Sequence, residues 1–411
     1  MSLWGNRTFV LHTASVTISA TGTAAAQVAV VFAVLGLGGS AGDVGLVGVA
    51  GLVPALAFFL VGGVVADRWP RNRVLVGATV LSALNQGVLG YLVLTGQARL
   101  VHIVVAAALS GLATAFVMPA AQGLLMRGVG RDQGSRAFAV FRLSLNLAQI
   151  GGSSLGGVLV ASAGPGWALL ADSLTYVVAI GLRLPMRIEG TMSVRGGVVR
   201  SLREGWTEFR SHRWLGPLVV QFAAVNALAV GAYELVLGPI VAGNAAAWGA
   251  IMAADATGMV LGGLLLVAWT PPRLSGVFGG ALTAAPLVAM AAGAPTAVVC
   301  AAAAFAGAGV ELFGVSLMTL LQKHVRHDRL SRVSAYQSLA GFGLTPAGTA
   351  LAGPFAAVAG TRGALGALSV ALLAIAAVCA RIVGGRWDDP GTNDEGVDRH
   401  GGKRAPGGRR A

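Results

Sequence analysis

Six ionisable side chains lie inside long apolar stretches of this sequence, where a side chain can bind charge or move protons away from bulk water. They are His12, Arg142, Asp172, Glu234, Asp255 and Glu311. A charged group in an oily environment is costly, so such residues mark ion or substrate paths by default. A carboxyl group in a low-dielectric site favours its neutral form and can therefore carry a proton. The four acids are thus the first candidates for a functional site.

Position within each apolar stretch separates these candidates. Arg142 lies about five residues from the end of its stretch, roughly 8 Å along a helix, where its long side chain could reach water. Glu234 lies near the end of its stretch, so a place at the membrane surface and a place in a binding site are equally open. Asp172 and Asp255 lie closer to the middle of theirs, and a structural hydrogen bond is the alternative role for Asp172.

The composition of the chain places these stretches in a membrane. Mean hydropathy is +0.75, 55% of the 411 residues are hydrophobic and only 11% are charged, whereas soluble domains carry about 25% charged residues. A membrane-spanning helix needs about 20 mostly apolar residues. The sequence therefore predicts an all-α membrane protein with twelve such helices, at about 9–36, 44–66, 74–95, 100–125, 137–161, 165–185, 215–238, 246–269, 274–293, 295–321, 333–358 and 361–383.

The twelve predicted helices form two groups of six. We expect an N-terminal bundle in 1–185, a cytoplasmic linker in 186–213, a C-terminal bundle in 214–383 and a disordered cytoplasmic tail in 384–411. Leu202, Trp206 and Phe209 share one helical stripe in the linker, which predicts an amphipathic helix at the membrane surface.

The basic residues indicate how the chain is oriented. Most of the 29 lysines and arginines fall at the two termini, in the linker and in alternate loops, so they share one side if both termini are cytoplasmic. This is the positive-inside pattern. It accounts for the net charge of +13 without a nucleic-acid partner, because basic residues beside the helices face anionic lipid. With arginine far more frequent than lysine, we expect a multi-pass protein of a bacterial inner membrane.

A charged loop between the second and third predicted helices has the pattern Gly-x-x-x-Asp-Arg-x-x-Arg-x-x-x-Leu. Its residues are Gly63, Asp67, Arg68, Arg71 and Leu75, with Arg73 alongside and Pro70 where glycine is usual. The loop resembles the one between helices 2 and 3 of major facilitator superfamily transporters. The resemblance implies that Asp67 and the arginines latch helix 2 to the start of helix 11, near Arg332 or Val333, where a helix dipole favours an acid.

Shorter motifs are similar to the macrolide-efflux and enterobactin-exporter group of this superfamily. They are, in chain order, Met118-Pro119-Ala120, Leu202-Arg203-Glu204-Gly205-Trp206, Arg213-Trp214-Leu215, Thr319-Leu320-Leu321-Gln322 and Arg332-Val333-Ser334. Two positions depart from proton-coupled relatives. Serine replaces the proline of the antiporter motif in 151–157, and Ser110 precedes Gly111 where many relatives have arginine.

The resemblance implies a secondary transporter whose two pseudo-repeated halves alternate access to a central site. It implies export of a small amphipathic or cationic compound, such as a drug or antibiotic, in exchange for protons. Glu311 is the strongest single candidate, because helix 10 lines the central cavity in family members. Asp255 could act with it, and substrate hydrogen bonds could come from His12, Gln27, Gln221 and Asn226.

Cofactors are not expected. The sequence has no Gly-x-x-x-x-Gly-Lys-Ser/Thr loop, so ATP is not expected to drive transport directly. Cys300 and Cys379 lie in different apolar stretches and suggest neither a disulfide nor a metal site. The expected partners are a small-molecule substrate, protons and membrane lipids, and we expect a monomer.

Other interpretations remain open. The residues do not fix transport direction or cargo, so import, or movement of a siderophore, sugar or lysolipid, is an alternative, as is a non-transporting scaffold. The stretch Gly152-Ser153-Ser154-Leu155-Gly156 matches the Gly-x-Ser-x-Gly of serine hydrolases, which requires a strand-to-helix turn. Because this copy lies in a predicted helix, we expect close helix packing instead, with Gly152, Gly156, Gly258 and Gly262 between the two halves.

Overall fold

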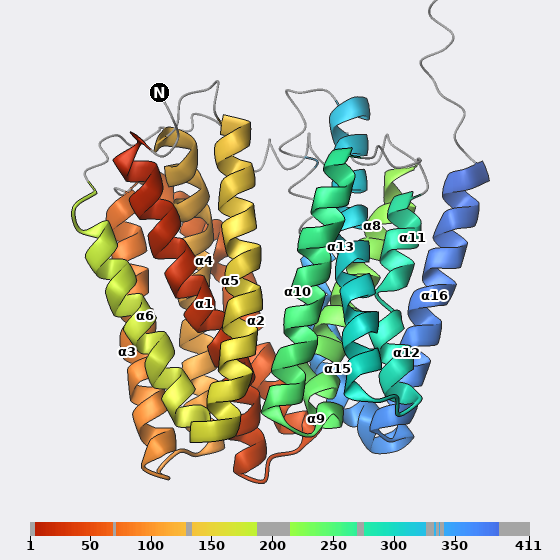
Figure 1. Cartoon of the computed structure of the whole chain (residues 1–411), viewed down its shortest axis with the longest axis horizontal. Coiled ribbons are helices and arrows are strands. Elements are labelled where there is room, and N and C mark those ends of the chain that lie inside the picture. The colour runs from red at the N-terminus through yellow and green to blue at the C-terminus, as the bar shows by residue number, and fades with distance from the viewer. Residues whose placement is uncertain are drawn as a thin grey trace, which may run out of the picture.

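The computed structural model describes residues 5–68, 71–128, 134–186, 214–268, 275–325, 333, 337 and 341–385. Within these ranges the chain is helical and contains no strand. Figure 1 shows two bundles side by side, one from the N-terminal half and one from the C-terminal half. The predicted amphipathic helix of the linker and the predicted disordered tail lie outside the described residues.

The N-terminal bundle contains six long helices. They are α1 (Arg7–Gly36), α2 (Ala41–Arg68), α3 (Arg71–Leu94), α4 (Leu100–Gly128), α5 (Gly134–Ala163) and α6 (Pro165–Arg183). The ends follow local chemistry: the Asn6 side chain accepts the Phe9 N–H at 3.1 Å at the start of α1. Between α5 and α6, Gly164 takes a φ of 91°, a value that favours glycine, and Pro165 begins the next helix.

The C-terminal bundle is more broken. Its elements are α8 (Leu215–Ala224), η3 (Val225–Leu237), α9 (Gly238–Ala242), α10 (Ala245–Ala268), α11 (Ser275–Leu282), α12 (Ala285–Ala291), α13 (Thr296–His324), α15 (Thr345–Ala359) and α16 (Thr361–Gly385). Eleven segments are long and apolar enough to cross a membrane, and the shorter Ser275–Ala291 stretch supplies a twelfth among the described residues. The predicted architecture of twelve helices in two bundles is therefore confirmed.

Two elements differ from the continuous helices that the sequence predicts. The seventh span contains η3, a thirteen-residue π-helix between α8 and α9. The ninth span is interrupted between α11 and α12, where the Thr283 hydroxyl donates to the Gly280 carbonyl at 2.7 Å. Pro286 follows at the start of α12, and its missing N–H suits a helix beginning rather than a helix interior.

The two bundles pack against each other at one end. We call the side with the N-terminus, the end of α6 and the start of α8 the linker side, and the opposite side the far side (Figure 1). On the far side the second half of α5 meets the start of α10, and the start of α2 meets the middle of α15. Glycines make this approach possible, since Gly353 lies against the Gly42 backbone and Gly157 against that of Gly249.

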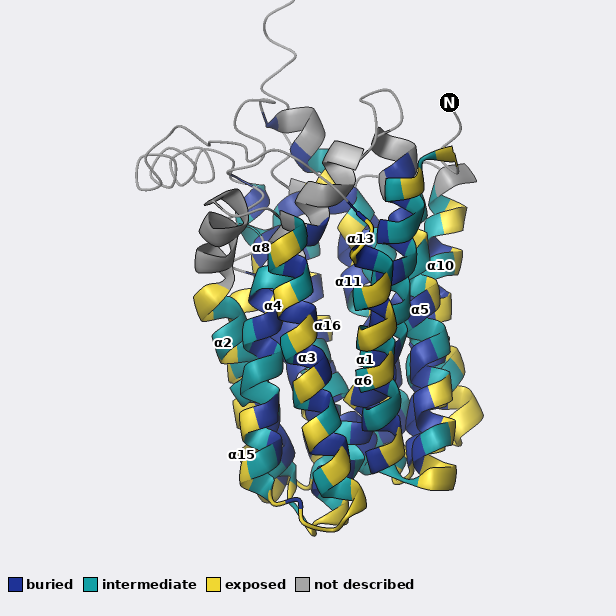
Figure 2. Cartoon of the chain, turned by 90° about the vertical axis from the view of Figure 1, so that its left-hand side faces the viewer, coloured by how far each residue is buried: buried dark blue, intermediate teal, exposed yellow. Residues whose placement is uncertain are grey.

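The outer surface of the bundles is apolar. Figure 2 shows exposed residues along the outer faces of the helices and buried ones between them. Leu155 and Phe305 are each 65% exposed, and Val358 is 90% exposed. Such contiguous exposure is unusual for a water-soluble monomer. Lipid chains would cover this surface in a membrane. Polar side chains are therefore expected in the interior, where other polar groups can bind them.

Candidate functional site

A cavity of about 300 Å³ lies inside the N-terminal bundle and reaches the C-terminal one. Residues of α1, α2, α3, α4 and α6 line it, and Leu235 of η3 is the contribution of the second bundle. Most of the wall is apolar. The polar lining residues are Thr23, Gln27, Gln86, Ser110, Thr114 and Tyr176. This volume is at the lower end of the range for sites that bind drug-sized molecules.

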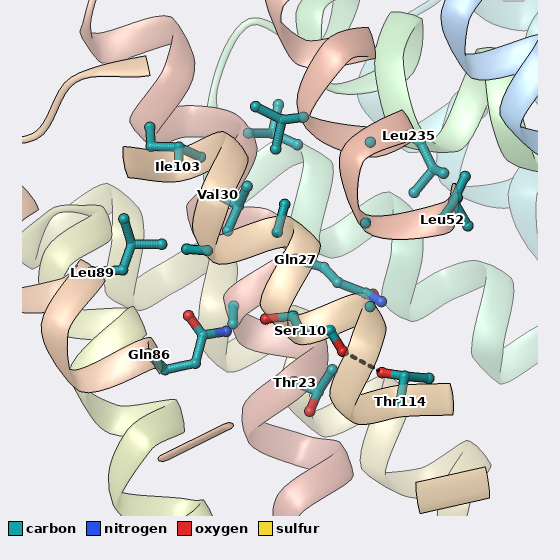
Figure 3. Close-up of a pocket in the computed structure, with 18 of the residues that line it drawn as sticks. Thr23, Gln27, Val30, Leu52, Gln86, Leu89, Ile103, Ser110, Thr114 and Leu235 are labelled. Atoms are coloured by element: carbon teal, nitrogen blue, oxygen red, sulfur yellow. Dashed lines mark hydrogen bonds between the residues drawn. The ribbon is translucent and has the colours of Figure 1, made fainter. Parts of the chain in front are cut away.

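Most of the polar groups in the wall are held by one another. The Tyr176 hydroxyl lies 2.8 Å from the Thr23 hydroxyl, which joins α6 to α1. The Asn85 amide donates to the Ser110 hydroxyl at 2.9 Å. The Thr114 hydroxyl donates to the Ser110 carbonyl at 2.9 Å (Figure 3). These bonds fix the side chains before any ligand enters, so the wall is preorganised.

Two glutamine side chains offer amide groups to the cavity. Gln27 of α1 is exposed, and Figure 3 shows it extending into the space between α1 and α4. Gln86 of α3 is only 7% exposed, and its Oε1 is buried without a hydrogen-bond partner. Gln27 was predicted as a site residue, whereas Gln86, Ser110 and Tyr176 were not.

Asp172 lies behind this wall and does not line the cavity. It is completely buried on α6, beside the Gln86 side chain. The Thr175 hydroxyl donates to its Oδ1 at 3.3 Å, while its Oδ2 has no hydrogen-bond partner. On the other side Asp172 packs against the Cα of Gly22 in α1, where no larger residue would fit. Its contacts are thus those of a helix-packing residue next to the cavity.

Arg183 is a buried charge that the sequence did not single out, because the positive-inside pattern placed it at the cytoplasmic surface. Its side chain is 1% exposed and points between α1 and α3. The guanidinium donates to the Ser15 hydroxyl at 3.1 Å and to the Thr79 hydroxyl. The Asn72 amide donates to the Arg183 carbonyl at 3.2 Å, so the end of α6 is tied to the start of α3.

His12 lies near this arginine and away from the cavity. It is 1% exposed, and its ring stacks on that of Phe141 with centroids 5.8 Å apart. Neither ring nitrogen has a hydrogen-bond partner. His12 is therefore placed where it contacts α5 rather than a ligand in the cavity.

The remaining acids gather in the C-terminal bundle. Glu234 on η3 and Asp255 on α10 lie close enough for their charges to interact. Tyr233 adjoins them, with its buried hydroxyl unpartnered and its ring edge-on to Trp248 at 5.7 Å. Leu235, which follows Glu234 in sequence, lines the cavity, whereas neither acid is among the described lining residues. Like charges that interact in a low dielectric repel each other.

Glu311 lies in a different place from this pair. Its side chain packs over Gly263 of α10, with its Oε1 near the position that a Cβ would take there. Asp255 of α10 packs against Gly307 of α13. Gly263 and Glu311 come later in these two helices, so they lie nearer the linker side than Asp255 does. The structure thus brings Glu234 and Asp255 together and keeps Glu311 apart from the described cavity.

The predicted polar residues of span 7 also lie outside the cavity. The Gln221 amide donates to the Val277 carbonyl at 2.8 Å and so joins α8 to α11. The Asn226 amide donates to the Phe222 carbonyl of its own helix at 2.8 Å. Both residues are buried.

The four predicted packing glycines face their own bundles, which corrects their expected position between the halves. Gly152 and Gly156 lie against α1, and Gly258 and Gly262 lie against α13. The helices α5 and α10 do meet across the halves, but at different glycines, Gly157 and Gly249. Helix periodicity places Gly157 on another face from Gly152 and Gly156, and a glycine pattern alone does not reveal which face a neighbour covers.

Two further predictions concern the Gly-x-Ser-x-Gly stretch and the latch of the charged loop. The Gly-x-Ser-x-Gly stretch lies within α5 and not at a strand-to-helix turn. The side chains of Gly63, Asp67, Arg68, Arg71 and Arg142 lie outside the described residues, as does Arg332, whereas Arg73 is exposed at the start of α3. The expected latch is therefore not described.

Comparison with known proteins identifies the fold and its relatives. A profile of the Major Facilitator Superfamily matches residues 13–342. The chain is 27% identical over 358 residues to the multidrug efflux pump Tap of Mycolicibacterium fortuitum, covering 80% of this chain and 84% of that protein. It is 30% identical over 171 residues to a Na(+), Li(+), K(+)/H(+) antiporter of Planococcus maritimus, covering 41% of this chain and 38% of that one.

A solved structure shows the same architecture. A POT family transporter in complex with 5-aminolevulinic acid superimposes with a TM-score of 0.72 at 10% identity, covering 92% of this chain and 96% of that one. At that identity the likeness concerns the fold alone. The profile match spans most of the chain and shows that this chain belongs to the Major Facilitator Superfamily and is a multi-pass membrane transporter of small molecules, not an enzyme.

Proposed function

We propose that this transporter exports small amphipathic compounds in exchange for protons. The observation that carries the proposal is the combination of a largely apolar cavity with a separate carboxyl pair, Glu234 and Asp255, whose first member precedes the lining residue Leu235. A mostly apolar wall suits drug-like molecules, and buried carboxyls suit proton transfer. The similarity to a multidrug efflux pump over 80% of the chain supports the same function.

The proposed orientation follows from the basic residues. With the arginine-rich linker and both termini in the cytoplasm of a bacterium, the far side faces outward. The packed ends of α2, α5, α10 and α15 then close the outer side. In this orientation the structure corresponds to a state closed to the exterior, from which the halves rock to release substrate outside, and we take the monomer as the working unit.

The charged loop has a part in this cycle. We assign Gly63, Asp67, Arg68, Arg71 and Arg73 to a cytoplasmic latch that holds the opposite state, with the linker side closed. An aspartate at a helix N-terminus is stabilised by free N–H groups and the helix dipole.

Proton coupling is assigned to the Glu234–Asp255 pair. In everted vesicles energised by respiration, addition of chloramphenicol should release protons from the lumen, seen as recovery of acridine-dye fluorescence. Glu234→Gln and Asp255→Asn should each reduce this recovery at least about 10-fold, since either change removes an exchangeable proton from the pair. Asp43→Asn is the matched control, because Asp43 is a partly exposed carboxylate at the far-side start of α2 that accepts hydrogen bonds from Ser40.

Two outcomes would contradict this assignment. Substrate uptake without proton movement in wild-type vesicles would show that transport is not coupled to protons. Full activity of both Glu234→Gln and Asp255→Asn would show that this pair does not carry the coupled proton. Glu311→Gln would then test the carboxyl of α13.

Exchange of monovalent cations for protons is the second candidate function. It is favoured by the 30% identity to the Na(+), Li(+), K(+)/H(+) antiporter and by the carboxyl pair, whose oxygens suit hard cations. The same vesicles distinguish the two functions. Fluorescence recovery on addition of sodium, lithium or potassium salts, without any drug, would favour cation exchange.

A further inference from the structure

We propose that the cavity takes the uncharged, hydrogen-bonding part of its ligand, an amide or hydroxyl group on a compact apolar frame, and that Gln86 recognises that group. The inference rests on the proposed function and narrows it, because it names the class of compound that the cavity selects. It also separates two possibilities that the sequence left together, amphipathic and cationic substrates.

The charge of the wall carries the first step. None of the described residues that line the cavity is an aspartate, glutamate, lysine, arginine or histidine. A cationic group there would lose its water without gaining a counter-charge, which is strongly unfavourable in a low dielectric. Asp172 is completely buried behind Gln86, and Glu234 is beside, not within, the lining. Among the described residues, a ligand in the cavity thus contacts no carboxylate.

The hydrogen-bonding state of the wall carries the second step. Thr23 and Tyr176 bond to each other, and Ser110 accepts from Asn85. Gln86 differs, because its Oε1 is buried and has no partner. A buried acceptor without a donor is costly, and turning the amide so that its oxygen accepts a ligand N–H or O–H in the cavity would remove that cost. Gln86 is therefore the wall group that gains most when a donor arrives.

The arrangement of the other lining residues describes the rest of the ligand. Figure 3 shows Gln86, Ser110 and Thr23 around one region of the cavity, with Leu89, Ile103 and Val30 above them in that view. Leu52 and Leu235 bound the side toward the second bundle, with Gln27 nearby. A ligand that fits has polar groups at one end and an apolar body at the other.

Equilibrium binding to the purified protein tests the inference with two probes. Chloramphenicol is neutral and carries an amide and two hydroxyls, whereas tetraphenylphosphonium is a permanent cation with an apolar surface. The wild type should bind chloramphenicol more tightly. Gln86→Leu should weaken chloramphenicol binding about 10-fold, with tetraphenylphosphonium unchanged. Gln86→Glu, which places a carboxylate in the wall, should shift the preference toward the cation.

Gln221→Leu is the matched control. Gln221 is also a buried glutamine whose Oε1 has no partner, but it joins α8 to α11 away from the cavity. The change should alter thermal stability without altering the ratio of the two affinities. Such a control separates recognition by Gln86 from a general effect of removing a buried amide.

Three results would overturn the inference. They are binding of tetraphenylphosphonium alone, binding of neither probe, and equal chloramphenicol affinity in the wild type and Gln86→Leu. The last result means that water or a wall residue already satisfies Gln86. Failure of the proposed function looks different, because chloramphenicol would still bind at equilibrium while the vesicle assay showed no proton movement.

Discussion

Gly157 provides the sharpest test of how the two bundles close on the far side. A Cβ at this position would come within 2.6 Å of the Ala245 carbonyl oxygen and 3.0 Å of the Gly249 Cα, where ordinary contacts begin at 3.4 Å. Both atoms belong to the backbone of α10, so neither can rotate away. The substitution Gly157→Ala must therefore push the start of α10 away from α5.

The size of the effect follows from the cost of overpacking. Forcing a methyl group into a close-packed contact costs about 1–3 kcal/mol. The clash exists only when the far side is closed, so this free energy shifts the balance between states by roughly 5- to 150-fold toward the state open on the far side. The protein itself should fold, because the packing within each bundle does not involve this contact.

Distances between spin labels measure that shift. Labels at Ser162 and Ala246, both exposed near the far-side ends of α5 and α10, report the separation, after Cys300 and Cys379 have been replaced. The population with long distances should grow in Gly157→Ala.

Gly151→Ala is the control for the spin-label experiment, since a Cβ at Gly151 of the same helix meets nothing within 4 Å. Identical distance distributions for Gly157→Ala and the wild type would refute the proposed closure, and so would an equal shift in Gly151→Ala.

Two stability predictions concern the buried polar groups. Thr79→Val should lower the unfolding free energy by about 1–3 kcal/mol, because the buried Arg183 guanidinium loses an acceptor. Thermal unfolding of the purified protein measures this, with a change at the exposed Thr95, Thr95→Val, as the control. An unchanged melting temperature of Thr79→Val would contradict the prediction. Tyr233→Phe should leave the melting temperature unchanged or raise it, because it removes a buried hydroxyl that has no partner. A clear fall in the melting temperature of Tyr233→Phe would mean that this hydroxyl makes a stabilising bond.

The fold was largely predictable because each membrane helix needs a long apolar stretch, and the stretches are separated by polar or glycine-containing breaks. The interruption between α11 and α12 was missed although Pro286 marked it, since the hydropathy of 274–293 is continuous. The π-helical bonding of η3 leaves no pattern in the residue types. The segment packs against α15, where Gly231 meets the Thr345 carbonyl.

The site was less predictable, because charges in apolar stretches attract notice and neutral polar residues do not. Gln27 was predicted, but the adjacent Asn85 and Gln86 were not, although two amides in mid-helix are a signal in a membrane span. Arg183 was assigned to the surface because it ends its apolar stretch, where a long side chain usually reaches water. Which way such a residue turns depends on partners far away in sequence, here Ser15 and Thr79.

The wide winding of η3 has a mechanical consequence. A π-helix bonds each N–H to the carbonyl five residues back, one more than an α-helix, so every residue that changes from one pattern to the other turns all those after it. Leu235 and Glu234 are neighbours near the end of this segment. A change from π-helical to α-helical bonding would rotate both side chains together. A ligand that contacts Leu235 and a proton bound to Glu234 would therefore both affect the conformation of the same segment.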